Sequence, residues 1–272
     1  METILENAFI LFGIFTICKI FLQITKCLKY LILTKWVGVP NSFFRSLGEW
    51  AEQASGRKVK TIQVNFIKRD IYQHIKENLR GLEIGVLVNN VGMMQKPNPC
   101  RFLEMYDIDK TLDDIINVNV ISVVKMTQLV LPKMKERQKG LILNISSGVA
   151  NAPCPLYGLY SSTKIFMERF SRGCQAEYGS KGIIIQCLMP YAVASAMSQV
   201  NPGILAKSAK EYVRNSLDCT FLGDQSHGCV PHEIMAYVNG KIPHWITYND
   251  VFLDKIKGYL QNHARRYNYS QH

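Results

Sequence analysis

The chain has 272 residues, of which 47% are apolar and 19% charged, a composition that excludes an intrinsically disordered protein and permits a sizeable core. Lysine and arginine outnumber aspartate and glutamate by 32 to 21, but the excess is spread along the sequence and predicts no nucleic-acid partner. The eight cysteines show no spacing typical of metal sites and are too dilute for a disulfide scaffold. We therefore expect one main domain with reduced, mostly buried thiols and no metal.

The first apolar segment has the length of a membrane span. Residues 7–25 carry Lys19 as their only charge, and a segment of this length can cross a hydrocarbon core of about 30 Å. An acidic start and the lack of a small-residue cleavage site argue against a removed signal peptide. The positive charges that follow, with no negative charge up to residue 45, predict a cytosolic main domain. We expect a membrane anchor with a basic flank at 1–45 and the main domain at 46–272; a re-entrant or interfacial helix is the alternative to a spanning one.

Beyond residue 45, apolar runs of strand length alternate with longer segments of helical period. The pattern predicts strands at 59–66, 84–90, 141–147 and 183–190, and helices at 71–79, about 106–135, about 157–178 and about 206–217. Unbroken apolar strands between helices are typical of a parallel sheet that helices cover on both faces. The predicted fold class is therefore α/β.

Several polar residues fall near the ends of these predicted strands. Tyr160 and Lys164 stand four residues apart in a predicted helix, so that both side chains lie on one helix face. Ser147 ends the strand before this helix, residues 89–92 (NNVG) end the strand before that, and Asn119 lies in the intervening helix. Because open α/β sheets bind ligands at the carboxyl ends of their strands, we expect these groups at one functional edge.

The combination of NNVG, Asn119, Ser147 and YSSTK, in this order and at this spacing, resembles the motifs of the short-chain dehydrogenase/reductases. The runs SVVKMTQLVLPKM, RQKGLILNISSG and MPYAVASAM are similar to those of membrane-bound members that reduce 17-oxosteroids or very-long-chain 3-oxoacyl-CoA. The resemblance covers nearly the whole chain and implies a doubly wound, Rossmann-like parallel sheet. It implies NADPH-dependent reduction of a 17-oxosteroid, with 3-oxoacyl-CoA reduction as the alternative. A non-catalytic membrane-bound binding protein is a third hypothesis.

The resemblance also implies roles for individual residues. Tyr160 would protonate the carbonyl oxygen as hydride arrives, while Lys164 would favour the phenolate and bind the nicotinamide ribose. Ser147 would hold the substrate oxygen, and Asn119 would fix a water that links Lys164 to solvent. The residues implied in cofactor binding are Asn89, Gly92, Tyr160, Lys164, Val193 and Ser195. For Asn89, a structural role that pins neighbouring strands is an equal alternative.

The segment after the last predicted strand would form the substrate side of the site. In the family, residues 190–197 lie along the nicotinamide, and a loop at about 198–228 would close over an apolar substrate. The residues implied in the substrate wall are Ser147, Cys154, Leu156, Tyr157 and Met197. Ordinary core packing is the alternative for the apolar ones. Here Pro190 and Tyr191 stand where most of the family has Pro-Gly. The six histidines have no spacing of a ligand set, so we expect surface or structural roles for them.

A feature that the family requires is missing from the sequence. Its fold opens with a strand, a Gly-rich turn that binds pyrophosphate, and a helix. Here Ala51, which ends a stretch similar to the one before that strand, runs directly into EQASGRKVKTIQVNF, which resembles the end of the third helix and the third strand. Only the eight residues 52–59 stand where this unit would be expected. Because a βαβ unit needs roughly 30 residues, it cannot fit there. We therefore expect the first βαβ unit to be deleted and the Rossmann-like sheet to be truncated.

The deletion has a consequence for the sheet. The family order 3-2-1-4-5-6-7 would lose its first two strands, which separate the third from the fourth. Either the third strand would then move beside the fourth, or the sheet would expose a long apolar edge. The partners that the resemblance implies are a lipophilic carbonyl substrate and a membrane, with a homodimer as a further option. The family also implies a location in the endoplasmic reticulum membrane.

Overall fold

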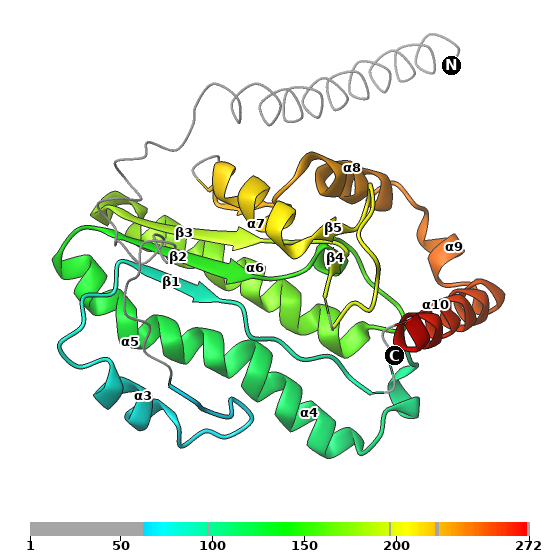
Figure 1. Ribbon diagram of the computed structural model, residues 1–272, viewed down its shortest axis with the longest axis horizontal. Helices are drawn as coiled ribbons and strands as arrows, with labels where there is room; N and C mark the ends of the chain where they lie inside the picture. Colours follow the sequence, from blue (N-terminus) through cyan, green and yellow to red (C-terminus); the bar gives the residue numbers. More distant parts are fainter. Residues whose placement is uncertain (1–61, 97, 196, 221–222, 271–272) are drawn as a thin grey trace, which may run out of the picture.

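The computed structural model describes residues 62–96, 98–195, 197–220 and 223–270 (Figure 1). The expected membrane anchor at 1–45, the junction of Ala51 with Glu52 and residues 59–61 of the first expected strand lie outside the described residues. The architecture below concerns the described ranges.

A parallel sheet with the strand order β1-β2-β3-β6 lies at the centre of the domain. Its strands are β1 (Val86–Asn89), β2 (Gly140–Ile145), β3 (Ile183–Leu188) and β6 (Gln225–Ser226). The register pairs Val86 with Leu141 and Gly140 with Ile183. The apolar runs predicted at 84–90, 141–147 and 183–190 thus form neighbouring parallel strands, which confirms the α/β class.

Helices join the strands and follow the last one. Those before β3 are α3 (Tyr72–Asn78), η2 (Phe102–Glu104), α4 (Ile108–Ile116), the π-helical turn η3 (Asn117–Ile121), α5 (Ser122–Glu136), η4 (Gly148–Asn151), α6 (Gly158–Tyr178) and η5 (Gly179–Lys181). Those after β3 are α7 (Ala209–Asp218), α8 (Val230–Asn239), α9 (His244–Thr247) and α10 (Asp250–Ser270). A second, two-stranded sheet pairs β4 (Val193–Ala194) with β5 (Lys207–Ser208). The predicted helices at 71–79, 106–135, 157–178 and 206–217 are therefore present, with boundaries shifted by a few residues.

One continuous helix in the described part of the chain, Ile108–Glu136, is long and apolar enough to cross a membrane. Half of its most apolar window is buried inside the domain. Val130 and Met134 of this helix belong to the core cluster beneath the sheet. It is therefore a core helix, and it does not bear on the anchor expected at 7–25.

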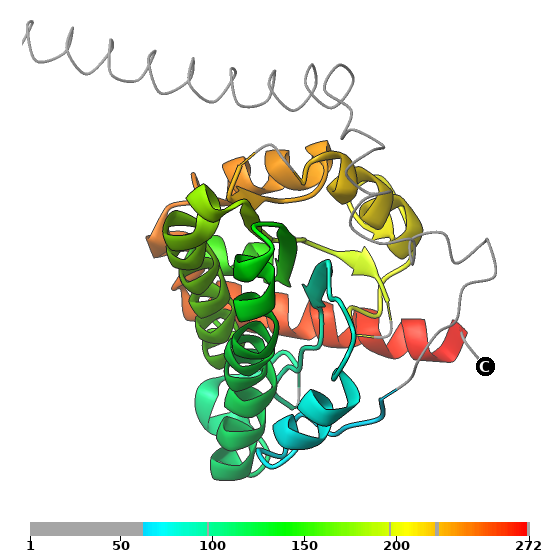
Figure 2. The ribbon, with the colours of Figure 1, turned by 90° about the vertical axis from the view of Figure 1, so that its left-hand side faces the viewer.

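The two faces of the main sheet are covered unequally. On one face α5 and α6 lie side by side along the strands (Figure 2), and the buried strand residues that pack against them are Leu87, Ile142, Ile183 and Ile185. The opposite face carries a smaller cluster that packs against Leu217 of α7, and its buried strand residues are Leu141, Leu143 and Leu188. Val88 alternates with Leu87 and is 44% exposed. The second face of β1 is therefore the thinly covered part of the sheet.

Residues 62–66, the described part of the first expected strand, form no strand. The segment that follows is held by Asn117 at the end of α4, whose Nδ2 donates to the Ile67 carbonyl at 3.0 Å and whose Oδ1 accepts from Arg69 Nε at 2.8 Å. Among the described residues β2 is the one ladder partner of β1. The strand prediction is wrong for 62–66, because an extended apolar run forms a strand only where a neighbour offers a ladder. Within the described residues β1 is an edge strand, the second of the two outcomes considered for a truncated sheet.

Gly182 sets the turn into β3. Its φ of +73° lies in the left-handed region, and a Cβ at this position would overlap the backbone carbonyl oxygen of Gln138. Since backbone cannot move aside as a side chain can, Gly182→Ala should destabilise the domain by about 1–3 kcal/mol. The midpoint of thermal unfolding, followed by circular dichroism, should fall by several degrees.

Gly173→Ala is the matched control, because Gly173 lies inside α6 and a Cβ there would meet open space. This change should raise stability by about 0.5–1 kcal/mol, the ordinary gain for alanine over glycine in a helix. An unaltered midpoint in Gly182→Ala would show that the turn can relax.

Candidate active site

The polar residues singled out from the sequence lie around the carboxyl ends of β1, β2 and β3. Gly92 follows β1, and Ser147 follows β2 and begins η4. Tyr160 and Lys164 lie in the first two turns of α6, the helix that follows η4. Because the strands are parallel, their carboxyl ends meet at one edge of the sheet, as in ligand sites of open α/β folds.

Tyr160 is a buried phenol beside Ser147. The side chain is 7% exposed. Burial raises the pKa of Tyr160 to about 12, and the hydrogen bond with Ser147 opposes this rise. At neutral pH the phenol therefore keeps its proton, which is the state that a proton donor needs. The lowering expected from Lys164 is not among the causes of this shift, which are burial and the opposing hydrogen bond with Ser147.

Lys164 is a buried amine, with 3% of its surface exposed. Its Nζ donates to the Ile145 carbonyl at 2.9 Å and lies 5.6 Å from the centre of the Tyr160 ring. Burial lowers the pKa of Lys164 to about 8, since a charged ammonium is poorly solvated there. The structure thus brings Ser147, Tyr160 and Lys164 into one cluster.

Gly92 leaves room beside this amine. A Cβ at Gly92 would lie 3.3 Å from Lys164 Nζ and 3.7 Å from Asn119 Oδ1. Asn119 is fully buried on the π-helical turn, where its Nδ2 donates to the Met93 carbonyl and to Thr163 Oγ1, both at 2.9 Å. Its Oδ1 accepts from the Met93 amide at 2.8 Å. These contacts use both amide protons to hold the segment after β1 against α6, so the expected water-binding role of Asn119 stays a prediction.

Asn89 lies at a strand-to-strand contact. Its Nδ2 donates to Oδ1 of Asn144, its register partner on β2, at 2.7 Å, and lies 3.5 Å from Thr127 Oγ1. Asn144 in turn donates to Ser171 Oγ of α6 at 2.8 Å. These bonds favour the structural alternative for Asn89, which pins β1 to β2.

A cavity of about 680 Å³ opens at this edge, within the range of small-molecule sites. The predicted site residues that line it are Gly92, Ser147, Tyr157, Tyr160, Lys164, Val193, Ser195 and Met197. Asn89, Asn119, Cys154 and Leu156 do not line it. Leu156 is instead buried, with its carbonyl accepting from Gln95 Nε2 at 2.7 Å, and burial raises the pKa of the Cys154 thiol to about 11. Cys154 and Leu156 thus lie outside this lining, and the wall role expected for them stays a prediction.

The segment after β3 forms the outer wall. The β4–β5 pair places Val193 opposite Lys207 and Ala194 opposite Ser208. Ser208 then begins α7 and forms a capping box with Glu211. The inner side of α7 then places Tyr212 on the cavity. Within the loop expected at 198–228, residues 209–218 form α7, and Tyr212 and Val213 of this helix line the cavity together with Ser198 and Val200.

Sequence reasoning missed a polar chain behind this wall. Asn151 Nδ2 lies 3.2 Å from the Tyr191 hydroxyl and 2.8 Å from His227 Nε2, and His227 Nδ1 lies 2.8 Å from Glu233 Oε2. The fully buried His232 lies 3.3 Å from the Tyr191 amide, and burial lowers its pKa. The signal that could have revealed this chain is Tyr191 itself, which stands where the family has glycine.

The position of the Tyr191 ring requires a glycine at residue 148. A Cβ at Gly148 would overlap the Tyr191 ring, so the ring packs directly on the backbone beside Ser147. The tyrosine at this position, the glycine that makes room for it and the polar chain that holds it form one unit of the wall.

Comparison with known proteins identifies the family. The family model described as short chain dehydrogenase matches residues 45–202. The chain is 39% identical over 306 residues to 17-beta-hydroxysteroid dehydrogenase type 3 of Danio rerio, which covers 97% of this chain and 100% of the relative. The Homo sapiens protein of the same name is 40% identical over 294 residues, covering 93% and 94%. The very-long-chain 3-oxoacyl-CoA reductase of Anas platyrhynchos is 50% identical over 198 residues, covering 72% and 63%.

Solved structures support the fold. A short-chain dehydrogenase from Sphingobium yanoikuyae in complex with NADPH gives a TM-score of 0.55 at 24% identity, covering 64% of this chain and 69% of that one. The alignment with the Danio rerio relative is longer than this chain, so part of the relative has no counterpart here. The family model spans more than half of the sequence, and the Danio rerio and Homo sapiens relatives match nearly all of it. The chain therefore belongs to the short-chain dehydrogenase/reductase family.

Proposed function

We propose that the chain carries the catalytic half of an oxidoreductase that reduces a lipophilic ketone, first of all a 17-oxosteroid, with NADPH as the hydride donor. The observation that carries this proposal is the meeting of Ser147, Tyr160 and Lys164 in one cavity of about 680 Å³. The long matches to proteins named 17-beta-hydroxysteroid dehydrogenase type 3 support the steroid as substrate.

Each residue of the cluster has a step that its surroundings suit. Ser147 binds the substrate carbonyl oxygen, and Tyr160, protonated at neutral pH because burial raises its pKa to about 12, donates the proton. NADPH, when bound, supplies the hydride. Lys164, whose Nζ lies 5.6 Å from the centre of the Tyr160 ring, provides the positive charge that stabilises the phenolate left after the transfer.

The described residues fit one end of that cofactor and not the other. Gly92 leaves space beside Lys164, and Val193 and Ser195 line the same cavity, an arrangement that suits a flat nicotinamide ring. Between residue 62 and β1, Gly81 and Gly85 are the only glycines, and they do not form a Gly-rich turn. The residues present therefore offer no cradle for the pyrophosphate within the described part of the chain.

The missing contacts set the expected affinity. A charge-assisted hydrogen bond is worth about 1.5–3 kcal/mol, so loss of three or four to the pyrophosphate would weaken binding by roughly three or more decades. We propose that the first βαβ unit is deleted between Ala51 and Glu52 and that this form of the protein is impaired as a reductase. The long alignment with the Danio rerio relative supports the deletion.

Reduction of a 3-oxoacyl-CoA is the second candidate. It is favoured by the 50% identity to the Anas platyrhynchos reductase, although that match covers 72% of this chain. The two are separated by assaying NADPH oxidation with a 17-oxosteroid and with a long 3-oxoacyl-CoA. Both the unaltered chain and a chimera are assayed. The chimera carries, inserted after Ala51, the residues of the Danio rerio relative that have no counterpart in this chain. If the chimera turns over neither substrate, the remaining candidate is a non-catalytic binding protein.

Replacement of the proton donor tests the chemistry. In the chimera, Tyr160→Phe should lower turnover at least ~10²-fold, the lower range for general acid catalysis, with little change in secondary structure. Tyr237→Phe on α8, outside the cavity lining, is the matched control and should keep its turnover. Turnover in Tyr160→Phe near that of the control would remove the phenol from the mechanism.

The buried amine should make stability depend on pH. The pKa of Lys164 is about 8 in the folded chain and ~10.4 in an unfolded one, so the unfolded state binds more protons between these values. The folded state should therefore gain stability as pH rises through this window. The chain should gain roughly 1–3 kcal/mol relative to Lys164→Met between pH 7 and pH 10.5, measured as thermal midpoints.

Lys181→Met is the control, because Lys181 is exposed and lies outside the cavity. It should follow the unaltered chain across the same pH range. Parallel curves for the unaltered chain and Lys164→Met would mean that the amine is solvated.

We also propose that the protein is anchored in the endoplasmic reticulum membrane by residues 7–25, with its main domain in the cytosol and a homodimer as an option. The apolar segment and its basic flank support attachment. After expression in cells, the protein should stay with the membrane fraction through high salt and alkaline carbonate washes. Release into the supernatant would contradict a spanning anchor, and a version that begins at residue 46 serves as the control.

A further inference from the structure

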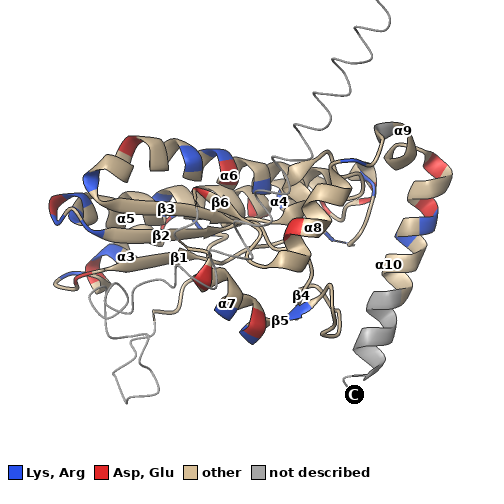
Figure 3. Ribbon diagram, turned by 90° about the horizontal axis from the view of Figure 1, so that it is seen from above, with Lys and Arg blue, Asp and Glu red and all other residues tan. Residues whose placement is uncertain are grey.

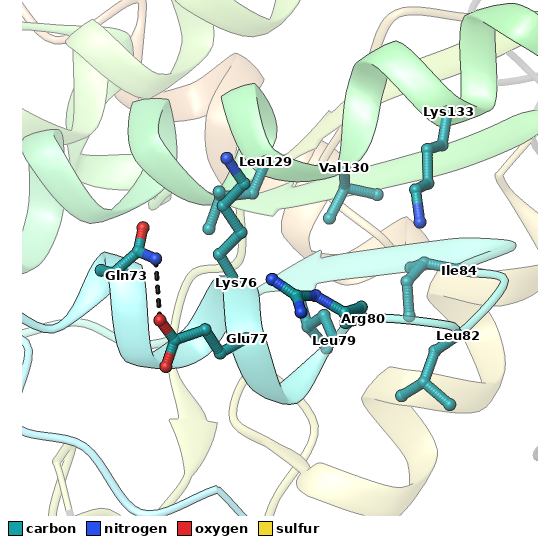
Figure 4. A pocket seen from close by; sticks show the side chains of 10 residues that line it. All are labelled: Gln73, Lys76, Glu77, Leu79, Arg80, Leu82, Ile84, Leu129, Val130 and Lys133. Carbon is teal, nitrogen blue, oxygen red and sulfur yellow. Dashed lines mark hydrogen bonds between the residues drawn. The ribbon is translucent and has the colours of Figure 1, made fainter.

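A second cavity lies near the amino ends of the parallel strands, whereas the site described above lies at their carboxyl ends. It has a volume of about 230 Å³ and opens between α3, α5 and the segment that leads into β1 (Figure 4). Ile84, which lines it, stands two residues before the start of β1 and so marks the amino ends of the parallel strands. The catalytic residues follow the carboxyl ends, so this groove is a separate site.

Aliphatic side chains form the floor of the groove. They come from the end of α3, the turn into β1 and one side of α5, and they are Leu79, Leu82, Ile84, Leu129 and Val130. Leu82 is 43% exposed, while Val130, on the α5 side of the groove, belongs to the buried core. The floor is therefore continuous with the main hydrophobic core and leaves part of its apolar surface exposed to water.

Three cations stand around this floor. Lys76 and Arg80 come from α3 and the turn after it, and Lys133 comes from α5; Figure 4 shows their head groups extending into the space between the two helices. None of the three has a carboxylate partner among the described residues. The one acidic residue in the lining, Glu77, accepts from Gln73 Nε2 at 2.8 Å.

Ordinary structural roles account for only part of this charge. The C-terminal ends of α3 and α5 both lie here, and each carries a partial negative charge of roughly half a unit. Two such ends and Glu77 sum to about two negative charges against three positive ones. Arg137, a fourth cation nearby, is already engaged by the Ile84 carbonyl at 2.7 Å and by Glu83 at 3.4 Å. The groove is left net positive.

We propose that this groove binds the carboxylate and the first methylene groups of a fatty acid. The cations bind the carboxylate, and the aliphatic floor covers the start of the chain. Inorganic phosphate would leave the floor uncovered, and a neutral lipid would leave the cations unpaired. The volume lies below the ~300 Å³ at which clefts enclose drug-sized ligands, so a steroid or a whole acyl-CoA does not fit.

Photo-crosslinking tests this site without reference to catalysis. The full chain, held in discs of neutral phosphatidylcholine, is irradiated with an octanoate that carries a diazirine on its chain, and the labelled peptides are identified by mass spectrometry. Label is expected in segments 73–84 and 129–133. Unlabelled octanoate should compete, octanol and octylamine should not, and a rise from ~0.05 to ~0.5 M salt should weaken labelling because the pairs are exposed.

Charge variants make the test specific. The triple change Lys76→Gln, Arg80→Gln and Lys133→Gln should reduce labelling about tenfold, since exposed charge pairs are individually weak. Lys135→Gln, which removes an exposed cation from α5 outside the groove, should leave labelling unchanged. A thermal melt of each variant shows that it is folded.

Three results would overturn the proposal. The first is equal labelling of the triple variant and Lys135→Gln. The second is label confined to the catalytic cavity or scattered over the surface. The third is loss of labelling when the disc contains anionic phosphatidylglycerol at constant octanoate, which would assign the groove to a phospholipid head group of the bilayer. None of these results depends on whether the chain reduces a ketone.

Discussion

Parallel pairing of β1, β2 and β3 is the constraint on which the site depends. The register that joins Asn89 to Asn144 and Asn144 to Cys187 brings together strand ends that are more than forty residues apart in sequence. Only because all three strands run the same way do Gly92, Ser147 and the start of α6 meet at one edge. The Asn89–Asn144 hydrogen bond reinforces this pairing from within, on the face that α5 and α6 bury.

Burial at this edge has a cost that bears on function. Lys164 and Tyr160 are both nearly inaccessible to solvent. Burial lowers the pKa of Lys164 and raises the pKa of Tyr160, so that the neutral form of each side chain is favoured. The cluster therefore holds an amine and a phenol that burial leaves poorly solvated, an arrangement typical of functional sites. Other charged side chains on α6 and α10 have residues of opposite sign nearby. Figure 3 shows Lys and Arg mixed with Asp and Glu along these two helices.

The sequence was sufficient for the elements whose patterns are local. Apolar runs predicted β1, β2 and β3, and the spacing of Tyr160 and Lys164 predicted their shared helix face. Residues 62–66 failed as a strand because strand formation depends on a neighbour that this chain does not offer within the described residues. The Asn151–His227–Glu233 chain and the cationic groove could not be predicted, since their members come from elements whose contacts only the tertiary fold sets. Asn119 shows a third limit, because a motif position does not reveal how many of its hydrogen bonds the protein itself consumes.

We propose that the catalytic edge is retained while the pyrophosphate site is lost. Calorimetric titration of NADPH into the purified 272-residue chain, beside the chimera that carries the Danio rerio residues after Ala51, separates these two parts of the cofactor site. We expect micromolar or tighter affinity in the chimera and an affinity at least about three decades weaker in the unaltered chain, the loss that three or four charge-assisted hydrogen bonds represent. Micromolar affinity in the unaltered chain would contradict the claim and would mean that another segment binds the phosphates.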